Sequence, residues 1–229
     1  MDAVILCIGD ELLSGDIADL NSTWLAKNLT ELGTVVKRIE VVPDDIDVIA
    51  RTLKEIRADK VLVTGGLGPT HDDVTRQAVA LAFGRKLIRD PEAVKVVEAY
   101  AARYHRSPLP QSYNMADIPE NTTVIPNPVG AAPGFIVDNR VYTFPGVPSE
   151  MKAMFELVRQ QFRGPKLHVD WLISNKPESA LVNDLNEAVR LFPEVTFGSY
   201  PSGVVKIKMK SYDPDRLKAA KEWLAGRIL

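Results

Sequence analysis

The sequence predicts an α/β protein, with helices on both faces of a mostly parallel sheet and a smaller α+β domain after it. Three observations lead to this fold class. Residues 3–8 are apolar without interruption, as is typical of a strand buried on both faces. Strand and helix patterns then alternate over the first two-thirds of the chain. After Gly164-Pro165 the order becomes strand, helix, two strands and helix, so we expect domains at residues 1–164 and 165–229.

The first half of the chain carries strand and helix signals in regular alternation. Gly33 stands where a helix C-cap is expected, and Pro43 ends an apolar run. The expected elements are a strand at residues 3–9, a helix over 20–32, a strand at Val35–Val42, a helix over 46–56 capped by Asp44 or Asp45, a strand at Lys60–Thr64, a helix from about Asp72 to Phe83, and a helix opened by Asp90-Pro91.

The middle of the chain changes character. Residues 107–133 accumulate proline, asparagine and glycine, so residues 126–130 are expected to form a shaped loop. The expected elements beyond it are a strand pair at residues 134–137 and 141–144, a helix with Met151, Met154, Phe155, Val158 and Phe162 inward, and then, in the second domain, a strand at 167–173, a helix at Glu178–Leu191, strands at 195–200 and Val204–Ser211, and a helix at 215–228.

The composition predicts a cytoplasmic globular protein. Hydrophobic residues make up 45% and charged residues 25%, and the net charge of -2 indicates no strong attraction to nucleic acid or to a membrane. The single cysteine, Cys7, lies in the first apolar run and is expected to be a buried side chain rather than a nucleophile. That run is too short for a signal or membrane helix.

A glycine-rich turn after the third strand carries the clearest functional signal. Glycines allow backbone N–H groups to approach a ligand, and the following helix adds partial positive charge, so residues 65–70 are expected to hold a phosphate. Asp72 and Asp73 follow directly and would repel a bare phosphate. A divalent cation between these carboxylates and the phosphate removes the contradiction.

Other acidic or glycine-containing segments follow the ends of further strands. Gly9, Asp10 and Glu11 follow the first strand, Asp44 follows the second, and Glu150 follows a later one. Ligands of open parallel sheets bind at the carboxyl ends of strands, so we expect these segments to meet there. Helix capping remains an alternative for Asp44, Asp45 and Ser149. The sequence contains neither a P-loop nor a G-x-G-x-x-G motif after its first strand.

A lysine row marks the second domain. Lys206, Lys208 and Lys210 alternate with apolar residues, so one face of that strand is basic. We expect a solvated face on an edge strand, with RNA binding as the alternative. The domain lacks the G-x-x-G loop that nucleic-acid-binding KH domains use, so no nucleic-acid partner is expected.

Four motifs resemble those of the N-terminal module of the CinA family. The resemblance covers about residues 1–163, extends to the MoaB/Mog proteins and to a module of eukaryotic FAD synthase, and rests on residues 9–16 (GDELLSGD), 65–75 (GGLGPTHDDVT), 127–134 (NPVGAAPG) and 145–151 (PGVPSEM). The tail resembles the small KH-type domain of CinA, with Glu178-Ser179 at its first helix. The amidase domain usual in CinA is missing, which predicts a stand-alone protein.

The resemblance implies a three-layer α/β/α fold of the molybdopterin-binding (MoCF) type and a homodimer. In the molybdopterin branch, positions matching Asp73 and Asp44 serve adenylyl transfer. The CinA branch resembles an ADP-ribose pyrophosphatase that needs a divalent metal ion (Mg²⁺, Mn²⁺ or Co²⁺), with a monovalent cation as a further cofactor to be tested. This chain has leucine at position 67, where Mog proteins have threonine, which favours the CinA branch.

The leading hypothesis is metal-dependent hydrolysis of a nucleoside diphosphate compound, ADP-ribose by resemblance, to AMP and ribose 5-phosphate. The alternatives are a molybdopterin-binding or adenylylating protein and a non-catalytic nucleotide sensor. The candidate catalytic residues are Asp44, Asp72 and Asp73, and the candidate metal ligands are Asp10, Asp72, Asp73 and Glu150. The candidate substrate contacts are Gly9, Glu11, Asn21, Gly65, Gly66, Leu67, Gly68, Pro69, Thr70, Asn127, Pro128, Gly130, Gly146, Pro148 and Ser149.

Overall fold

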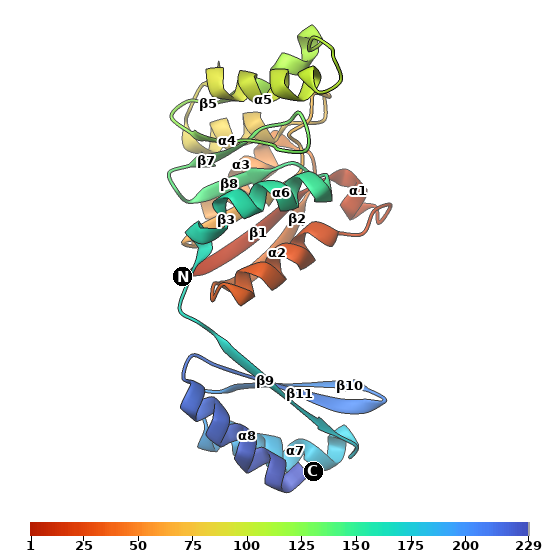
Figure 1. Ribbon diagram of the computed structural model, residues 1–229, viewed down its shortest axis with the longest axis vertical. Coiled ribbons are helices and arrows are strands. Elements are labelled where there is room, and N and C mark those ends of the chain that lie inside the picture. Colours follow the sequence, from red (N-terminus) through yellow and green to blue (C-terminus); the bar gives the residue numbers. More distant parts are fainter. Residues whose placement is uncertain (229) are drawn as a thin grey trace. The chain divides into compact units, whose positions relative to one another are not determined.

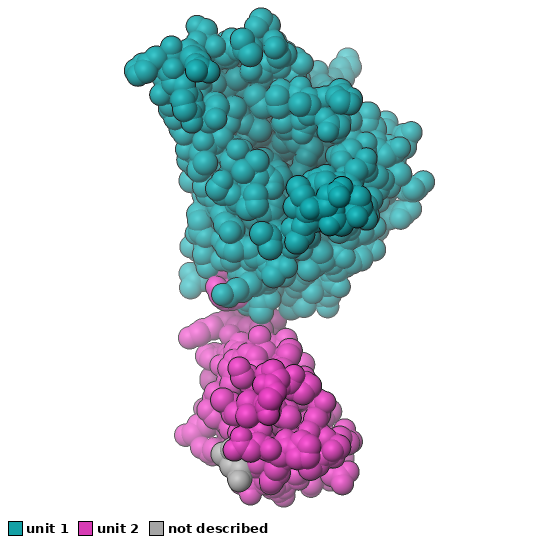
Figure 2. Space-filling model, turned by 90° about the vertical axis from the view of Figure 1, so that its right-hand side faces the viewer, with its two compact units in different colours: residues 1–30, 34–164 teal, residues 31–33, 165–229 magenta. Residues whose placement is uncertain are grey.

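A computed structural model describes residues 1–228 and divides into two compact units (Figures 1 and 2). Unit 1 comprises residues 1–30 and 34–164, and unit 2 comprises residues 31–33 and the chain from Pro165 onward. The second division falls at the Gly164-Pro165 step. Within the described residues, no helix is long and apolar enough to cross a membrane.

Unit 1 is built on a mixed six-stranded sheet in the order β2-β1-β3-β8-β7-β6. The first four strands of this order are parallel to one another, and β7 and β6 are added antiparallel. The predicted mostly parallel sheet is therefore confirmed. Its strands are β1 (Asp2–Ile8), β2 (Val35–Val42), β3 (Lys60–Thr64), β6 (Thr123–Ile125), β7 (Gly134–Val137) and β8 (Val141–Phe144).

Helices cover both faces of this sheet, as Figure 1 shows. On one face, α2 (Leu20–Glu31) and α6 (Pro148–Val158) meet through an edge-on contact of Trp24 with Phe155. On the other face, α3 (Ile46–Glu55) and α4 (Thr75–Phe83) bury Leu53 and Val79 against Leu6 of β1. The remaining helical elements are α1 (Asp10–Leu13), α5 (Pro91–Ala102), η1 (Pro110–Ala116) and η2 (Arg159–Phe162). This is the predicted three-layer α/β/α arrangement.

The sequence pattern missed three short strands, one of them before residues 107–133 and two within that stretch. β4 (Leu87–Arg89) and β5 (Asp117–Pro119) form a two-stranded antiparallel sheet, and β6 joins the main sheet. Each of these strands has three residues, which is too short to display a period of two.

Helix α4 begins at Thr75, so the predicted start at Asp72 is wrong. Residues 72–74 instead belong to the glycine turn. The Asp73 carboxylate accepts hydrogen bonds from the backbone N–H groups of Gly68 (2.7 Å) and Thr70 (2.9 Å), which holds it back from a helical position. The Thr75 hydroxyl donates to the carbonyl of Gly65 (2.8 Å) and ties the helix to the start of the turn.

Unit 2 has the predicted βαββα order. Its elements are β9 (His168–Ser174), α7 (Glu178–Leu191), β10 (Thr196–Ser202), β11 (Val204–Ser211) and α8 (Pro214–Ile228). The sheet is antiparallel, with the order β10-β11-β9. The expectation that the lysine-bearing strand lies at an edge is therefore wrong, because β11 occupies the centre.

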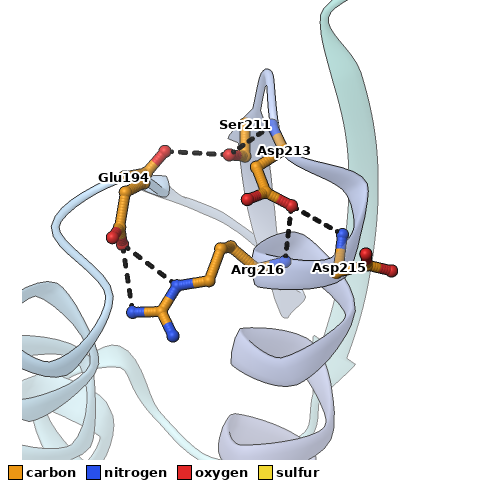
Figure 3. A network of polar contacts seen from close by, with 5 residues as sticks. All are labelled: Glu194, Ser211, Asp213, Asp215 and Arg216. Carbon is orange, nitrogen blue, oxygen red and sulfur yellow. Dashed lines mark hydrogen bonds and ion pairs between the residues drawn. The ribbon is translucent and has the colours of Figure 1, made fainter.

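A polar network fixes the turn between β11 and α8 (Figure 3). The Asp213 carboxylate accepts hydrogen bonds from the backbone N–H groups of Asp215 (2.9 Å) and Arg216 (3.1 Å), as a helix cap does. The Ser211 hydroxyl donates to the carbonyl of Glu194, whose carboxylate pairs with the Arg216 guanidinium at 3.3 Å. These bonds explain why α8 begins one residue earlier than expected.

The Gly65 backbone joins β3 to the glycine turn and leaves no room for a side chain. Its φ is +105°, and a Cβ atom there would collide with the carbonyl oxygen of Ile8. Gly84 ends α4 with φ +62°, also in the left-handed region, but with no atom within 4 Å of its Cβ position. The two glycines therefore differ in packing and share a positive φ.

This difference predicts unequal losses of stability. Gly84→Ala should lower the free energy of unfolding by about 1–2 kcal/mol, the usual strain of a left-handed residue. Gly65→Ala should cost at least about 3 kcal/mol because backbone strain and a backbone clash combine. Urea unfolding of both variants measures the losses, provided that the denaturant slope is unchanged. Equal losses would show that the Ile8 carbonyl moves away freely.

Candidate active site

A cleft of about 680 Å³ lies at the carboxyl ends of the parallel strands. Strand β2 lies on one side of β1, and β3 lies on the other. The order in which the chain adds strands to the sheet therefore reverses between β1 and β3. Such a switch point is where open α/β sheets bind ligands. The cleft is lined by segments that follow all four parallel strands of unit 1, as the sequence predicted.

Most of the predicted site residues meet in this cleft. Those that line it are Gly9, Glu11, Asn21, Asp44, Gly65, Gly66, Leu67, Gly68, Pro69, Asp72, Asp73, Gly146, Pro148 and Glu150. Those that do not line it are Asp10, Thr70, Asn127, Pro128, Gly130 and Ser149. The lining residues that sequence reasoning missed are Ile8, Leu12, Ile17, Ala18, Asp19, Leu20, Thr64, Tyr100, Met115, Ala131, Ala132, Pro145 and Val147.

Backbone amides of the glycine turn divide into engaged and unengaged groups. The N–H of Gly65 donates to the carbonyl of Phe144 (3.0 Å), and those of Gly68 and Thr70 donate to Asp73. Among the described residues, no acceptor faces the N–H of Gly66 or Leu67. The predicted phosphate cradle is thus narrower than residues 65–70. The amides without an acceptor belong to Gly66 and Leu67, which both line the cleft, and Leu67 is only 1% exposed.

Asp73 and Arg76 hold the turn from within. Besides two backbone N–H groups, the Asp73 carboxylate accepts the hydroxyl of Thr70 at 2.5 Å. The buried Arg76 guanidinium donates to the carbonyls of Leu67 (2.5 Å) and Gly68 (3.0 Å). Burial lowers the pKa of Arg76, and the negative charge of Asp73 acts in the opposite direction. Asp73 therefore shapes the turn, and Thr70 contributes through it.

The charge lining the cleft is of one sign. Its ionisable carboxylates come from every parallel-strand segment, and among residues 1–228 no lysine, arginine or histidine lines it. The acids are Glu11, Asp19, Asp44, Asp72, Asp73 and Glu150. Such a surface repels a phosphate ester unless a cation compensates it.

Asp44 is the acid most affected by its surroundings. Burial raises the pKa of Asp44, and the negative charges of Asp10, Glu11 and Asp72 raise it further. A hydrogen bond from the backbone N–H of Asp10 (2.9 Å) lowers it in part. Helix capping, the other interpretation of this pair of aspartates, falls to Asp45, whose carboxylate accepts the N–H of Val48 at 2.9 Å. Asp44 is therefore available to the cleft.

Asn127 and Gly130 act on the cleft through Glu150. The Asn127 amide donates to the Glu150 carboxylate at 2.7 Å, and its oxygen accepts the N–H of Gly130 at 2.7 Å. A Cβ atom on Gly130 would collide with that carboxylate. Both residues thus position an acid of the cleft wall. Ser149 is exposed and caps no helix end, because α6 has no side-chain cap.

A metal ion would not find a complete set of protein ligands here. Among residues 1–228, no group of three or more Asp, Glu, His or Cys side chains is arranged to hold one. Of the predicted ligands, Asp73 is engaged in the turn, Glu150 in a bond with Asn127, and Asp10 with the N–H of Asp44 (3.4 Å). The uncompensated acids do fit a cation that completes its shell with phosphate oxygens, as Mg²⁺ usually does.

Asn21 lines the cleft and carries a buried acceptor that has no partner among the described residues. Its side chain is only 8% exposed, and its Nδ2 donates to the carbonyl of Gly146 at 2.7 Å. Its Oδ1 is buried and has no hydrogen-bond partner. An unsatisfied buried oxygen costs free energy, so its position in a cleft wall points to a hydrogen-bond donor on a ligand.

Two family models together cover nearly the whole chain. Residues 4–164 match the model described as a probable molybdopterin binding domain, and residues 166–228 match the middle domain of FAD synthase. A protein of Archaeoglobus fulgidus is 40% identical over 223 residues, which cover 96% of this chain and 95% of that protein. The match extends across both units.

CinA-like proteins are also similar to this chain. A CinA-like protein of Desulfosudis oleivorans is 46% identical over 161 residues, which cover 68% of this chain and 39% of that protein. The crystal structure of CinA from Thermoplasma acidophilum, whose function is described as unknown, superposes with a TM-score of 0.66 at 34% identity. It covers 72% of this chain and 100% of that one. With the family model matched over most of its length, this chain belongs to the MoCF family of MoaB/Mog-like and CinA-like domains.

Proposed function

We propose that this protein hydrolyses the pyrophosphate bond of a nucleoside diphosphate compound, with ADP-ribose as the leading substrate and a divalent metal ion as cofactor. One observation carries the proposal: among the described residues, two residues with unengaged amides line a cleft whose charged side chains are all acidic. The amides suit phosphate oxygens, whereas the acids suit a cation. A metal-bound diphosphate satisfies both, and neither partner does so alone.

The residues divide the chemistry among them. The N–H groups of Gly66 and Leu67 donate to the diphosphate, close to the N-terminus of α4. Asp44 accepts a proton from a water molecule whose oxygen bonds to phosphorus, while the bridging P–O bond breaks. One water is consumed, and AMP and ribose 5-phosphate leave. Asp72 would hold the ion together with the phosphate oxygens, and the ion, when bound, would neutralise charge on those oxygens.

A second candidate is binding or adenylylation of molybdopterin. The observation that favours it is the description of the family model matched by residues 4–164. Molybdopterin also carries a phosphate, so the same two amides would receive it. The two candidates differ in what lies beyond the phosphate, and they call for separate substrates.

The first prediction concerns the substrate. With Mg²⁺, Mn²⁺ or Co²⁺, the protein should release AMP from ADP-ribose faster than from NAD, FAD or ADP-glucose, and EDTA should abolish the release. Chromatographic detection of AMP measures it, and molybdopterin with ATP is offered in parallel. Undiminished turnover in EDTA would remove the metal from the proposal. Adenylylated molybdopterin without AMP release from ADP-ribose would establish the second candidate.

The second prediction is that Asp44→Asn stabilises the protein and inactivates it. Since the pKa of Asp44 is raised on folding, the native state holds this proton more tightly than the unfolded chain, and stability falls as pH rises through that interval. Asparagine removes this loss at pH 7, so the melting temperature should rise. The gain should vanish below about pH 3.9, the usual pKa of aspartate.

The same Asp44→Asn variant should lose about 10²–10⁴-fold in kcat if Asp44 accepts the water proton. Asp45→Asn is the matched control because that residue only caps α3. It should keep its activity and lose stability slightly. An Asp44→Asn enzyme with full turnover would show that another group takes the proton, and a lower melting temperature would contradict the stability argument.

The third prediction concerns the unpartnered oxygen of Asn21. Asn21→Ala should weaken AMP binding about 5–10-fold, which is the usual worth of one hydrogen bond. If the donor is a ribose hydroxyl, 2′,3′-dideoxy-AMP should bind both proteins alike. Asn28→Ala is the control, because Asn28 lies on the same helix with the same 8% exposure but outside the cleft. Calorimetry measures each affinity for AMP. An equal loss of affinity in Asn21→Ala and Asn28→Ala would contradict the role proposed for the Asn21 oxygen.

A further inference from the structure

The three-stranded sheet of unit 2 is covered on one face only. Helices α7 and α8 lie together on one side of it in Figure 1, and Leu181 and Leu224 pack with Ile207 of β11 in the core of this unit. Residues at the alternate positions of the strands point away from this core. The most exposed of them are Val169 (43%), Trp171 (44%), Ile173 (54%) and Tyr200 (51%).

The strand register places these side chains around the lysine row. Lys208 is paired with Trp171 on one side and Gly198 on the other, and Lys206 with Ile173 and Tyr200. Lys210 is paired with Val169. We call the surface made by Val169, Trp171, Ile173, Tyr200, Lys206, Lys208 and Lys210 the open face.

Two aromatic rings form a contiguous platform on the open face. The centroids of Trp171 and Tyr200 are 5.7 Å apart, with their planes inclined by 51°. The Nζ atom of Lys208 lies 5.2 Å from the centroid of Trp171. Trp171 lies on β9 and Tyr200 on β10, the two outer strands of this sheet. A contiguous exposed group of aromatic side chains is typical of a binding surface.

The charge of the open face is uncompensated. Lys206, Lys208 and Lys210 make no ion pair among the described residues. The one acid of β9, Asp170, instead pairs with Lys221 of α8 at 2.8 Å. Alternate residues of a strand are about 7 Å apart, so the lysines form a row of like charges along the central strand. That arrangement weakens the sheet unless an anion is recognised there.

We propose that the open face binds single-stranded nucleic acid, with phosphates along the lysine row and bases stacked on Trp171 and Tyr200. Aromatic side chains beside a basic track are the recurring solution for this ligand. A second copy of the chain is disfavoured, because two-fold pairing of this face would set one lysine row against another. A duplex is disfavoured because its base faces are hidden within the stack.

Charge partition between the units supports this occupant. Residues 165–229 contain ten lysines and arginines against eight acids, whereas residues 1–164 contain eighteen against twenty-two. Unit 2 also includes Glu31, so it carries ten basic residues against nine acids, a slight positive excess in a chain of net charge -2. A nucleic-acid partner was not expected from the sequence, partly because the lysines were expected on an edge strand. Strand β11 is central, so that reason no longer holds.

The test uses the full chain and a fluorescein-labelled 12-nucleotide oligouridine, read by anisotropy at several salt concentrations. If all three lysines contact phosphates, log K should fall with log salt at a slope near about -2, since each contact contributes about -0.7. Lys208→Gln should reduce that slope by about 0.7. Lys218→Gln, on the exposed surface of α8, should leave it unchanged.

Stacking is tested with aromatic variants. Trp171→Ala should weaken oligouridine binding roughly fivefold or more, and Trp171→Phe should restore most of it. Tyr104→Ala removes an exposed aromatic ring of unit 1 and should have no effect. Circular dichroism of each variant separates lost binding from lost folding, because all of these side chains are on the surface.

Three results would overturn the proposal. One is equal affinity for polyglutamate of the same charge, which would identify a general polyanion surface and favour an acidic protein partner. Another is equal affinity for an RNA duplex of the same length. The third is displacement of oligouridine by excess AMP, which would place the oligonucleotide in the cleft of unit 1. Each leaves the proposed hydrolase activity unaffected, so the two proposals fail separately.

Discussion

The close approach of Gly65 to the carbonyl of Ile8 is the constraint on which the site depends. A strand that turned away earlier would leave the carboxyl ends of β1 and β3 apart, and any side chain at position 65 would push them apart. The N–H of Gly65 also binds the carbonyl of Phe144, so three neighbouring strands are fixed at their ends by one residue. Gly66 and Leu67, whose amides have no acceptor among the described residues, follow directly and line the cleft.

Asp73 and Arg76 make this turn rigid, so the acids at and near the turn do not all have the same role. An aspartate whose carboxylate already accepts three hydrogen bonds is preorganised to shape a loop. Its neighbours Asp44 and Asp72 are less engaged and have more to gain from a cation. The division between acids that build the turn and acids that face the ligand is invisible in the sequence, where Asp72 and Asp73 are simply adjacent.

The sequence predicted the sheet and the convergence of the site well because both follow from general rules. A fully apolar β1 requires cover on both faces, and parallel strands bring their carboxyl ends to one edge. Contacts made by distant segments could not be predicted. Tyr100 reaches the cleft from the last turn of α5, and the Asp19 carboxylate accepts the N–H of Ser22 as a helix cap does. The Asn21 amide nitrogen donates to the distant Gly146 carbonyl, and its oxygen has no partner among the described residues.

The order of strands in unit 2 could not be predicted from the sequence, for a similar reason. The alternation along β11 shows that one face is basic, yet alternation is the same in a central strand as in an edge strand. Only the pairing of β11 with β9, across the α7 connection, decides the matter. That pairing surrounds the lysines with Trp171, Ile173 and Tyr200, and a row of surface charges thereby becomes a charged and aromatic surface.

In both units the functional proposals rest on charged side chains that have few ion-pair partners. Many other charged side chains of the chain are paired. Arg89 binds the Asp117 carboxylate with two nitrogens, and Lys221 and Arg216 pair with acids of their own unit. Most acids of the cleft and the three lysines of the open face have no such ion pair among the described residues, the exposed His71 beside Asp72 being an exception. A ligand of opposite charge would therefore stabilise both surfaces. A metal-bound diphosphate would be such a ligand for unit 1, and a nucleic-acid backbone would be one for unit 2.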